Sequence, residues 1–276
     1  MKPSFLLLLV AGLCFTCTTQ KNLNTSVQSN IIQKENFHLY LLMGQSNMAG
    51  RGKVEALDTL IHPRVFMLDK SGSWMLAKDP MHFDKTVAGT GLGLTFGKIM
   101  ANENPDIKIG LIPTAVGGSS IDQWFADSLF QQTNTYPYED MILRAQKAME
   151  TGTLKGIIWH QGESDSNSEG AVSAYIQKFE AMLDSLRADL GIVSVPMVIG
   201  EIGYFFYPKA EFARDMNEVI RQIATTDKCI GLVTAEGLDH KGDSTHFDSN
   251  SYHALGVRYA AKMQEIQRHC PILFKK

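Results

Sequence analysis

The sequence predicts an α/β fold, a three-layer α/β/α sandwich built on a mostly parallel, flavodoxin-like sheet. Short apolar or β-branched runs alternate along the chain with longer segments of helical periodicity. Strands that alternate with helices form a parallel sheet that is covered by helices on both faces. No internal repeat or mid-chain linker interrupts residues 36–276, and a chain of this length suits one large domain.

The individual elements follow from these patterns. Strands are expected where apolar runs are bounded by turn residues, at residues 37–43, 64–68, 107–113, 156–159, 196–200 and 230–235. Helices are expected where apolar residues recur with the helical period, at residues 91–102, 138–151, 170–190, 209–225 and 251–268. Ligands of such folds bind beyond the carboxyl ends of the strands, so polar residues at those ends are candidates for a functional site.

Ser46 directly follows the first predicted strand. A serine in a tight strand-to-helix turn is poorly suited to packing and well suited to act as a nucleophile. The turn lifts its hydroxyl above the sheet, and the following helix directs backbone N–H groups toward whatever binds there. The alternative is an ordinary βα loop. The Gly-x-Ser-x-Gly elbow of α/β-hydrolases is disfavoured, because Met48 stands in place of its final glycine.

A serine nucleophile requires a base and a group that orients this base. Asp243 and His246 are three residues apart, just before the last predicted helix, so one turn can place the carboxylate and the imidazole on the same side. Two alternatives are weaker. The side chains of Asp239 and His240 point apart because the residues are adjacent, and His253 already lies within the helix.

Two other strand ends offer hydrogen-bond donors for an oxyanion. Gly117 and Gly118 follow the strand at residues 107–113, and glycine lets a backbone N–H approach a ligand closely. A plain turn is the alternative interpretation of these glycines. Gln161 ends the strand at residues 156–159, where its amide can act as a neutral donor, and the neighbouring His160 is expected to border the site.

Several polar residues next to these segments are expected to support the site. Gln45 and Asn47 flank the serine, and Glu163 follows the Gln161 turn. Asp165 is expected to cap a helix, because acidic side chains are favoured at helix N-termini. Glu201 follows the strand at residues 196–200, and we expect it to form a structural ion pair at the same edge of the sheet.

Four segments together resemble the SGNH hydrolase superfamily, and within it the sialate O-acetylesterase-like and acetylxylan esterase group (carbohydrate esterase family six). The segments occur in the order typical of the family and extend over nearly all of the chain that follows the N-terminal segment. They are Gly44-Gln45-Ser46-Asn47-Met48-Ala49-Gly50, Gly117-Gly118-Ser119-Ser120-Ile121 with Trp124, Trp159-His160-Gln161-Gly162-Glu163-Ser164-Asp165, and Asp243-Ser244-Thr245-His246-Phe247.

The resemblance implies the SGNH hydrolase fold and a role for each matching residue. Ser46 resembles the nucleophile of the family, and its backbone N–H resembles the first oxyanion donor. Gly118 resembles the backbone donor of the second segment and Gln161 the third donor, at a position where many superfamily members carry asparagine. Asp243 and His246 resemble the acid and base of the triad. No cofactor is implied, and the sequence has no Cys/His cluster with the spacing of a metal site.

The N-terminal segment is expected to direct export. Lys2 precedes an apolar run at residues 5–15, which is too short to cross a bilayer because a spanning helix needs about 20 residues. Residues 1–17 are therefore interpreted as a signal peptide, and the polar residues 18–35 as a flexible tether.

Cys17 is a candidate for lipidation, because a small residue, Thr16, precedes it. Cys14 is a poorer candidate, and the alternative is that both cysteines are removed with the signal. We expect an exported protein, either periplasmic or anchored to the outer membrane as a bacterial lipoprotein. Any membrane attachment is expected only through a lipidated Cys17.

Charge and cysteine content set further limits on function. The formal net charge is −3 with charges of both signs mixed along the chain, so no nucleic-acid partner is expected.

Cys229 begins a predicted strand and Cys270 follows the last predicted helix. Both are expected at the edge of the sheet that lies away from the site, where an oxidising compartment would allow them to form a disulfide.

The predicted function is that of a serine O-acetylesterase that removes acetyl groups from an acetylated oligo- or polysaccharide, with xylan as the first candidate. A sialate O-acetylesterase is the alternative, and the carboxylate of sialic acid would favour Arg51 near the site. A non-catalytic glycan-binding lipoprotein is the alternative from another class. A lipid or thioester hydrolase is disfavoured, because no long apolar lid segment is evident.

Some aromatic residues either offer faces for sugar rings or pack in the core: Trp124, Tyr204, Phe205, Phe206 and Tyr207.

Overall fold

The computed structural model describes residues 33–275. The predicted signal peptide at residues 1–17 and residues 18–32 of the predicted tether lie outside the described residues. The last two residues of the predicted tether, Lys34 and Glu35, are instead part of a 3₁₀ helix, η1 (Lys34–Asn36), which directly precedes the first strand.

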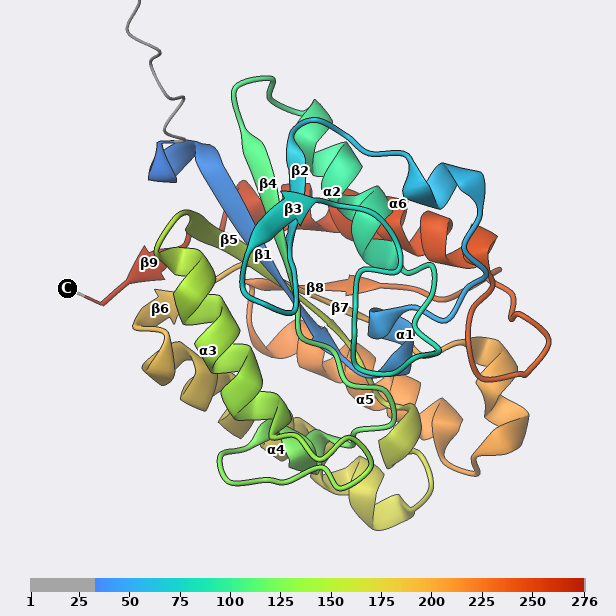
Figure 1. The fold of residues 1–276 in the computed structure, drawn as a ribbon. Helices are drawn as coiled ribbons and strands as arrows, with labels where there is room; N and C mark the ends of the chain where they lie inside the picture. Colours follow the sequence, from blue (N-terminus) through green and yellow to red (C-terminus); the bar gives the residue numbers. More distant parts are fainter. Residues whose placement is uncertain (1–32, 276) are drawn as a thin grey trace, which may run out of the picture. The chain divides into compact units, whose positions relative to one another are not determined.

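A seven-stranded sheet forms the centre of the described unit (Figure 1). All its strands are parallel except β3, which pairs antiparallel with β2 at one edge. The parallel strands are those that the sequence predicts. In spatial order the strands are β3 (Trp74–Leu76), β2 (Val65–Leu68), β4 (Lys108–Pro113), β1 (Phe37–Gly44), β5 (Thr153–His160), β7 (Met197–Gly200) and β8 (Ile230–Val233).

The strand order refines the flavodoxin-like expectation. In the flavodoxin order the second strand lies beside the first, whereas here β4 lies between β2 and β1. The chain first builds the sheet on one side of β1 and then crosses to β5 on the other side. The carboxyl ends of β1, β4 and β5 are consequently neighbours, and these strands lead to the serine, the paired glycines and Gln161.

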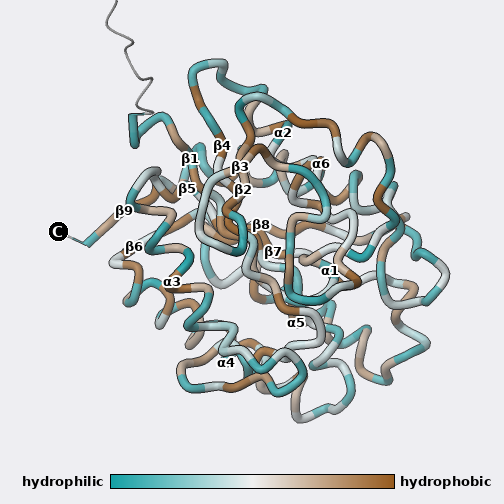
Figure 2. Tube along the Cα trace, viewed as in Figure 1, coloured by the Kyte–Doolittle hydropathy of each residue, from teal (hydrophilic) through white to brown (hydrophobic). Residues whose placement is uncertain are grey.

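Helices cover both faces of the sheet and complete the predicted three layers (Figure 1). Alternate residues of β1 enter two different cores, since successive side chains of a strand point to opposite faces. Leu39 and Leu41 pack on the side of three helices, α3 (Pro137–Met149), α4 (Glu169–Asp189) and α5 (Ala213–Thr226). Tyr40 and Leu42 pack on the side of α2 (Leu92–Asn102) and α6 (Ser249–Gln267). Figure 2 shows hydrophobic residues gathered along the central strands.

Some elements differ from the sequence prediction. The short strands β3, β6 (Ile192–Ser194) and β9 (Leu273–Phe274) were not expected. The fourth predicted helix was expected to begin at residue 209, but α5 begins at Ala213, because the preceding segment forms a separate 3₁₀ helix, η5 (Tyr204–Lys209).

A disulfide joins Cys229 and Cys270, as the sequence suggests. Cys229 directly precedes β8, and Cys270 follows the C-terminus of α6. The bond therefore ties the last helix to the edge strand at the amino end of the parallel sheet, which is the end opposite the site. Across residues 33–275, no helix has both the length and the apolar character that crossing a membrane requires.

Candidate active site

Ser46 lies at the turn between β1 and the four-residue helix α1 (Ser46–Ala49). The strand ends at Gly44, whose φ of +130° belongs to the left-handed region, and a Cβ there would lie 2.2 Å from the carbonyl oxygen of His160. Only glycine fits this turn. Ser46 is the first residue of the helix, and its backbone N–H makes no hydrogen bond within the described residues.

Ser46, His246 and Asp243 meet in one hydrogen-bonded chain although 200 residues separate the serine from the histidine. The Nε2 atom of His246 lies 3.1 Å from Oγ of Ser46. The Nδ1 atom of the same ring lies 2.7 Å from Oδ2 of Asp243. With Nδ1–H donating to the carboxylate, Nε2 carries the lone pair that faces the serine hydroxyl, which is the geometry of a nucleophile, its base and an orienting acid.

The loop before α6 holds the histidine in place. Oδ1 of Asp243 accepts the backbone N–H groups of Thr245 and His246, at 2.9 and 2.8 Å, while its other oxygen accepts from the ring. Lys209 of η5 donates to the carbonyl oxygen of Asp243 and to the hydroxyl of Thr245. Residues 243–246 therefore form a local turn, in which the carboxylate of Asp243 fixes both the backbone and the imidazole of His246.

Burial and hydrogen bonding set the charges of this pair. Burial lowers the pKa of His246 below its ordinary value, although hydrogen bonding and attraction to Asp243 oppose this. Burial alone would raise the pKa of Asp243, but hydrogen bonds from the backbone and ring of His246 and from the backbone of Thr245 outweigh it and lower that pKa to about 2. At neutral pH the histidine is a neutral base and the aspartate is ionised.

Asn47 connects the serine turn to the histidine loop. Its Nδ2 donates to the carbonyl oxygen of Thr245 at 3.0 Å and to the carboxyl group of Glu163. Its Oδ1 accepts from the backbone N–H of Phe247 and from the hydroxyl of Tyr252. Asn47 is fully buried, so these four bonds satisfy its amide and fix the distance between α1 and the segment that carries His246.

Glu163 lies beneath this connection with only 4% of its surface exposed. Burial raises the pKa of its carboxyl group to about 7, and the hydrogen bond from Asn47 only partly offsets that effect. One of its oxygens, Oε2, has no hydrogen-bond partner within residues 33–275. This arrangement fits the sequence-based expectation that Glu163 and Asn47 support the site.

The paired glycines form a second donor position. Gly118 has a φ of +87°, and its N–H makes no hydrogen bond within residues 33–275. The N–H of Gly117 is already occupied, because it donates to Asp84 at 2.8 Å. Asp84 in turn forms a buried ion pair with Arg51 at 2.6 Å. This pair, which no motif in the sequence indicates, fixes the turn and leaves Gly118 as the free donor.

Gln161 requires a correction. Its side chain is fully buried and its Nε2 faces three acceptors, namely Oε1 of Gln45, the carbonyl oxygen of Ser119 and Asp165. Its Oε1 accepts from Tyr175 at 2.6 Å. An amide nitrogen has two hydrogens, so none remains for a substrate, and in this structure Gln161 does not provide the expected oxyanion donor. It holds Gln45 instead.

In Gln45, the side-chain oxygen is occupied and the side-chain nitrogen is not. Its Oε1 accepts from Nε2 of Gln161 at 3.0 Å and from the backbone N–H of Ser164 at 3.2 Å. Since both partners are donors, the oxygen must face them. The Nε2 group is left free of these partners, one residue before Ser46.

The comparison with known families places the chain in one of them. The sequence profile of the family described as "Carbohydrate esterase, sialic acid-specific acetylesterase" matches residues 36–265. The chain belongs to this family. It is therefore a carboxylic ester hydrolase, and the family resemblance seen in the sequence is confirmed.

Relatives of this esterase agree with that assignment. It is 28% identical over 244 residues to the "Probable carbohydrate esterase" of Arabidopsis thaliana, across 80% of this chain and 88% of the relative. A solved structure of an Arabidopsis thaliana protein superposes with a TM-score of 0.74 at 26% identity, covering 84% of this chain and 98% of that one.

Two more distant structures share the fold of the esterase. NanS superposes with a TM-score of 0.68 at 18% identity, covering 86% of this chain and 99% of its own. A carbohydrate acetylesterase from Xanthomonas citri superposes with a TM-score of 0.64 at 21% identity, covering 84% of this chain and 56% of its own.

The rival acid–base pairs have structural roles in the esterase. His240 accepts backbone N–H groups of its own loop through Nδ1, and His253 pairs with Asp58 at 2.6 Å. His160 is fully buried and hydrogen-bonds Tyr259.

Two further acidic residues also have structural partners. Asp165 is not the N-cap that the sequence predicts: its carboxylate accepts the N–H of Ile121, the first residue of η3 (Ile121–Trp124), whose N-cap is Ser120. Ser168 caps the helix that follows Asp165, α4. Glu201 forms the expected ion pair, with Arg221.

Most of the aromatic residues that were candidates for stacking on sugar rings are packed against other protein residues. Trp124 is fully buried and donates its indole N–H to Ser119, so it belongs to the core. Phe206 is also buried, and half-buried Phe205 packs against Phe247. Tyr204 and Tyr207 are half-buried and stack on each other with ring centroids 5.2 Å apart.

Proposed function

We propose that this esterase removes O-acetyl groups from acetylated glycans by a serine mechanism, with xylan-type polysaccharide as its substrate. The observation that carries the proposal is the hydrogen-bonded chain from Ser46 through His246 to Asp243. A neutral imidazole at 3.1 Å from a serine hydroxyl at a helix N-terminus has the geometry required for general-base activation of a nucleophile.

The reaction proceeds in two steps. Nε2 of His246 takes the proton from Ser46 as Oγ attacks the acetyl carbonyl carbon, and the resulting imidazolium gives that proton to the departing sugar oxygen as the ester bond breaks. A water molecule then attacks the acetyl-serine while His246 takes its proton. Acetate leaves and Ser46 regains a proton from the imidazolium. Asp243 stays ionised throughout and stabilises the imidazolium.

The oxyanion is proposed to bind the backbone N–H groups of Ser46 and Gly118, with the free side-chain amide of Gln45 as the third donor. Both backbone groups lack acceptors within the described residues, and the Arg51–Asp84 pair fixes the glycine turn. Donors that are oriented before the reaction stabilise the developing charge without a reorganisation cost.

A neutral glycan is favoured over sialic acid by the position of Arg51. Its side chain is buried and its guanidinium donates to Asp84 and to the carbonyl oxygen of Gly50. The arginine that the sequence suggested for the sialate carboxylate is therefore already paired. The family description nevertheless includes sialic acid-specific acetylesterases, so sialate remains the second candidate substrate.

A panel of acetylated glycans tests the proposal. We expect acetate release from acetylated xylan to exceed release from O-acetylated sialic acid. The Ser46→Ala variant should lose at least about a thousand-fold of the turnover while keeping its circular dichroism spectrum. Turnover of a chromogenic acetate by Ser46→Ala at the wild-type rate would overturn the mechanism.

Covalent labelling separates the esterase from a glycan-binding protein that keeps the fold without catalysis. An organophosphonate should modify the wild-type protein at Ser46, as judged by peptide mass spectrometry, and should leave Ser46→Ala unmodified. Absence of labelling together with tight glycan binding would favour the non-catalytic alternative.

We further propose that the protein is exported and attached to a membrane by a lipid on Cys17. The apolar run at residues 5–15 and the small residue before Cys17 support this proposal. The full chain should partition into the membrane fraction, and Cys17→Ser should move it to the soluble periplasmic fraction. Equal partitioning of both proteins would contradict lipidation.

A further inference from the structure

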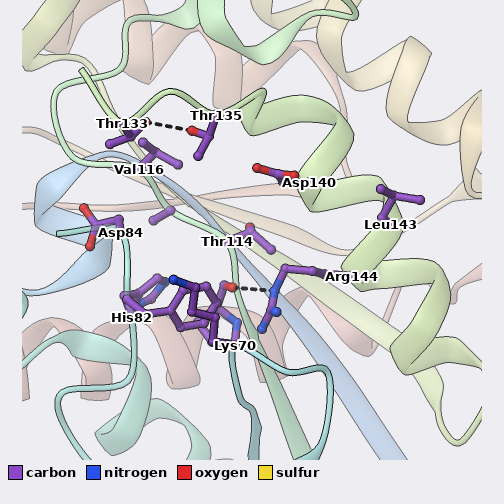
Figure 3. Close-up of a pocket in the computed structure, with 13 residues that line it drawn as sticks. Lys70, His82, Asp84, Thr114, Val116, Thr133, Thr135, Asp140, Leu143 and Arg144 are labelled. Atoms are coloured by element: carbon purple, nitrogen blue, oxygen red, sulfur yellow. Dashed lines mark hydrogen bonds between the residues drawn. The ribbon is translucent and has the colours of Figure 1, made fainter. Parts of the chain in front are cut away.

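A cavity of about 450 Å³ lies beyond the carboxyl end of β4. One wall is residues 113–116, which lead directly into Gly117 and Gly118. The opposite wall is α3, and His82 and Asp84 close a third side (Figure 3). Ser46, Asp243 and His246 do not line this cavity, so it is distinct from the nucleophile site although it borders the oxyanion turn.

Two buried polar atoms in the wall of this cavity lack hydrogen-bond partners within the described residues. They are Nε2 of His82 and Oδ1 of Asp84. The exposed fractions of these side chains are small, at 6% for the His82 residue and 1% for the Asp84 side chain. A buried polar atom that is left without a partner costs about 1–3 kcal/mol, so a pair of them beside an open volume indicates a place for a polar ligand.

The free carboxylate oxygen, Oδ1 of Asp84, requires a ligand that donates a hydrogen bond. Oδ1 belongs to a carboxylate whose other oxygen is occupied by Arg51 and by the N–H of Gly117. Burial lowers the pKa of His82 to about 4, so its ring is neutral. A neutral imidazole has one N–H and one lone pair, so a hydroxyl group, which both donates and accepts, can pair with Nε2 in either tautomer.

The cations near the cavity do not create an anion site. Arg144 donates to the carbonyl oxygens of Leu68, Asp69 and Pro113, and its guanidinium lies 4.6 Å from the ring centroid of Phe83. Lys70 is exposed, and Asp140 on α3 lines the same cavity. A ligand carboxylate next to Oδ1 of Asp84 would place two acceptors together with no proton between them. A neutral sugar unit meets these requirements, because each hydroxyl can donate to one atom and accept from another.

We propose that this cavity is a subsite for a neutral, hydroxyl-rich glycosyl unit that neighbours the acetylated unit on the same glycan. The inference rests on the proposed function, because it assigns the ligand to the same substrate chain. Asp84 links the two places, since its Oδ2 fixes the oxyanion turn while the residue also lines the subsite and its Oδ1 has no partner within the described residues. Occupation of the subsite should strengthen binding of longer glycans and leave the chemistry at Ser46 unchanged.

Binding of an unacetylated oligosaccharide tests the subsite independently of catalysis. Xylotriose, which carries no ester, is titrated into the Ser46→Ala protein while the ring signals of His82 are followed by NMR. We expect saturable shifts of these signals. N-acetylneuraminate, an anionic sugar, should leave them unchanged, and equal shifts with both sugars would overturn the preference for a neutral unit.

Two variants with matched controls complete the test. Leu143→Trp fills the mouth of the cavity from an exposed helix position, and Val257→Trp places the same side chain at an exposed position of α6, on the other side of the sheet. His82→Phe removes Nε2 but keeps a planar ring. Its control is His269→Phe, at an exposed histidine just beyond the C-terminus of α6.

Leu143→Trp, which fills the cavity, and His82→Phe, which removes a hydrogen-bonding atom, should each raise KM for an acetylated xylo-oligosaccharide about three- to ten-fold. The value of kcat for 4-nitrophenyl acetate should stay unchanged, and both control variants should behave as the wild type. If His82→Phe does not fold, Leu143→Trp still decides the question.

Static His82 signals together with unchanged KM values would show that the cavity holds water only and would overturn the inference. Failure of the proposed function would give a different result, because no glycan would then release acetate even if xylotriose shifted the His82 signals.

Discussion

At the scale of single residues, the proposed role of His246 as the base makes activity depend on its neutral form. The base must be unprotonated, and burial holds its pKa below the ordinary imidazole value of about 6.5. As pH falls, activity should therefore persist to lower pH than an unperturbed histidine would allow. We expect the acid limb of kcat/KM for a chromogenic acetate to reach half its maximum below pH 6.5.

Asp243→Asn provides the matched variant for this profile. Asp243 raises the pKa of His246, so its removal should shift the acid limb to still lower pH while the rate falls. A flat profile between acid and neutral pH, or an acid limb above pH 7, would exclude His246 as the base.

The proposed exchange of roles between Gln45 and Gln161 also belongs to the residue scale. Gln45→Glu keeps the inward oxygen that accepts from Gln161 and Ser164 but replaces the outward donor with an acceptor. We expect kcat to fall about 10²–10³-fold, the loss typical of an oxyanion donor, with little change in KM. Gln222→Glu, an exposed position on α5, is the control. Wild-type kcat in Gln45→Glu would remove Gln45 from the proposed oxyanion site.

At the scale of secondary-structure elements, the disulfide fastens α6 to β8 at the end of the sheet opposite the triad. The double variant Cys229→Ser/Cys270→Ser should lower the free energy of unfolding by about 4 kcal/mol, because the bond closes a loop with a sequence separation of 41 residues. Chemical denaturation measures this loss.

The esterase rate of the same double variant should match the wild type under conditions where both are folded. Reduction of the wild-type protein should reproduce the loss of stability. A large decrease in kcat without unfolding would contradict the separation of the disulfide from the site.

The parallel strands illustrate which elements a sequence can predict. Their apolar runs are long enough to be buried on both faces, and each was predicted within a few residues. The three short strands carry no such run, since they exist through pairing with neighbours. The start of α5 was predicted too early, because the sequence does not reveal that the preceding residues form a 3₁₀ helix.

At the scale of the whole molecule, buried titrating groups link stability to pH. Burial raises the pKa of Glu163 to about 7, well above the ordinary glutamate value. Between about pH 4.5 and 7 the folded protein therefore binds this proton more strongly than the unfolded chain does. The contribution of Glu163 to stability must fall as pH rises through this interval.

Glu163→Gln isolates that contribution. The amide can still accept from Asn47 but does not titrate, so the variant should gain stability relative to the wild type as pH rises from about 4.5 to 7. The difference should not exceed about 3 kcal/mol, the value for roughly two and a half pKa units. Denaturation at several pH values measures it, with exposed Glu169→Gln as the control. A difference that does not change with pH would contradict the raised pKa.

The sequence by itself determined the fold class, the parallel strands and the Ser46, Asp243 and His246 set, because these depend on local patterns. An apolar run, a strand-to-helix turn and an acid three residues before a histidine are each visible within a short segment.

Only the tertiary structure decided which amide of Gln45 and Gln161 is free, that Arg51 is paired with Asp84, and that His82 lines a cavity. These features depend on which side chains from distant segments compete for the same donors and acceptors. That competition is settled only when the chain has packed, since burial forces polar groups to find partners.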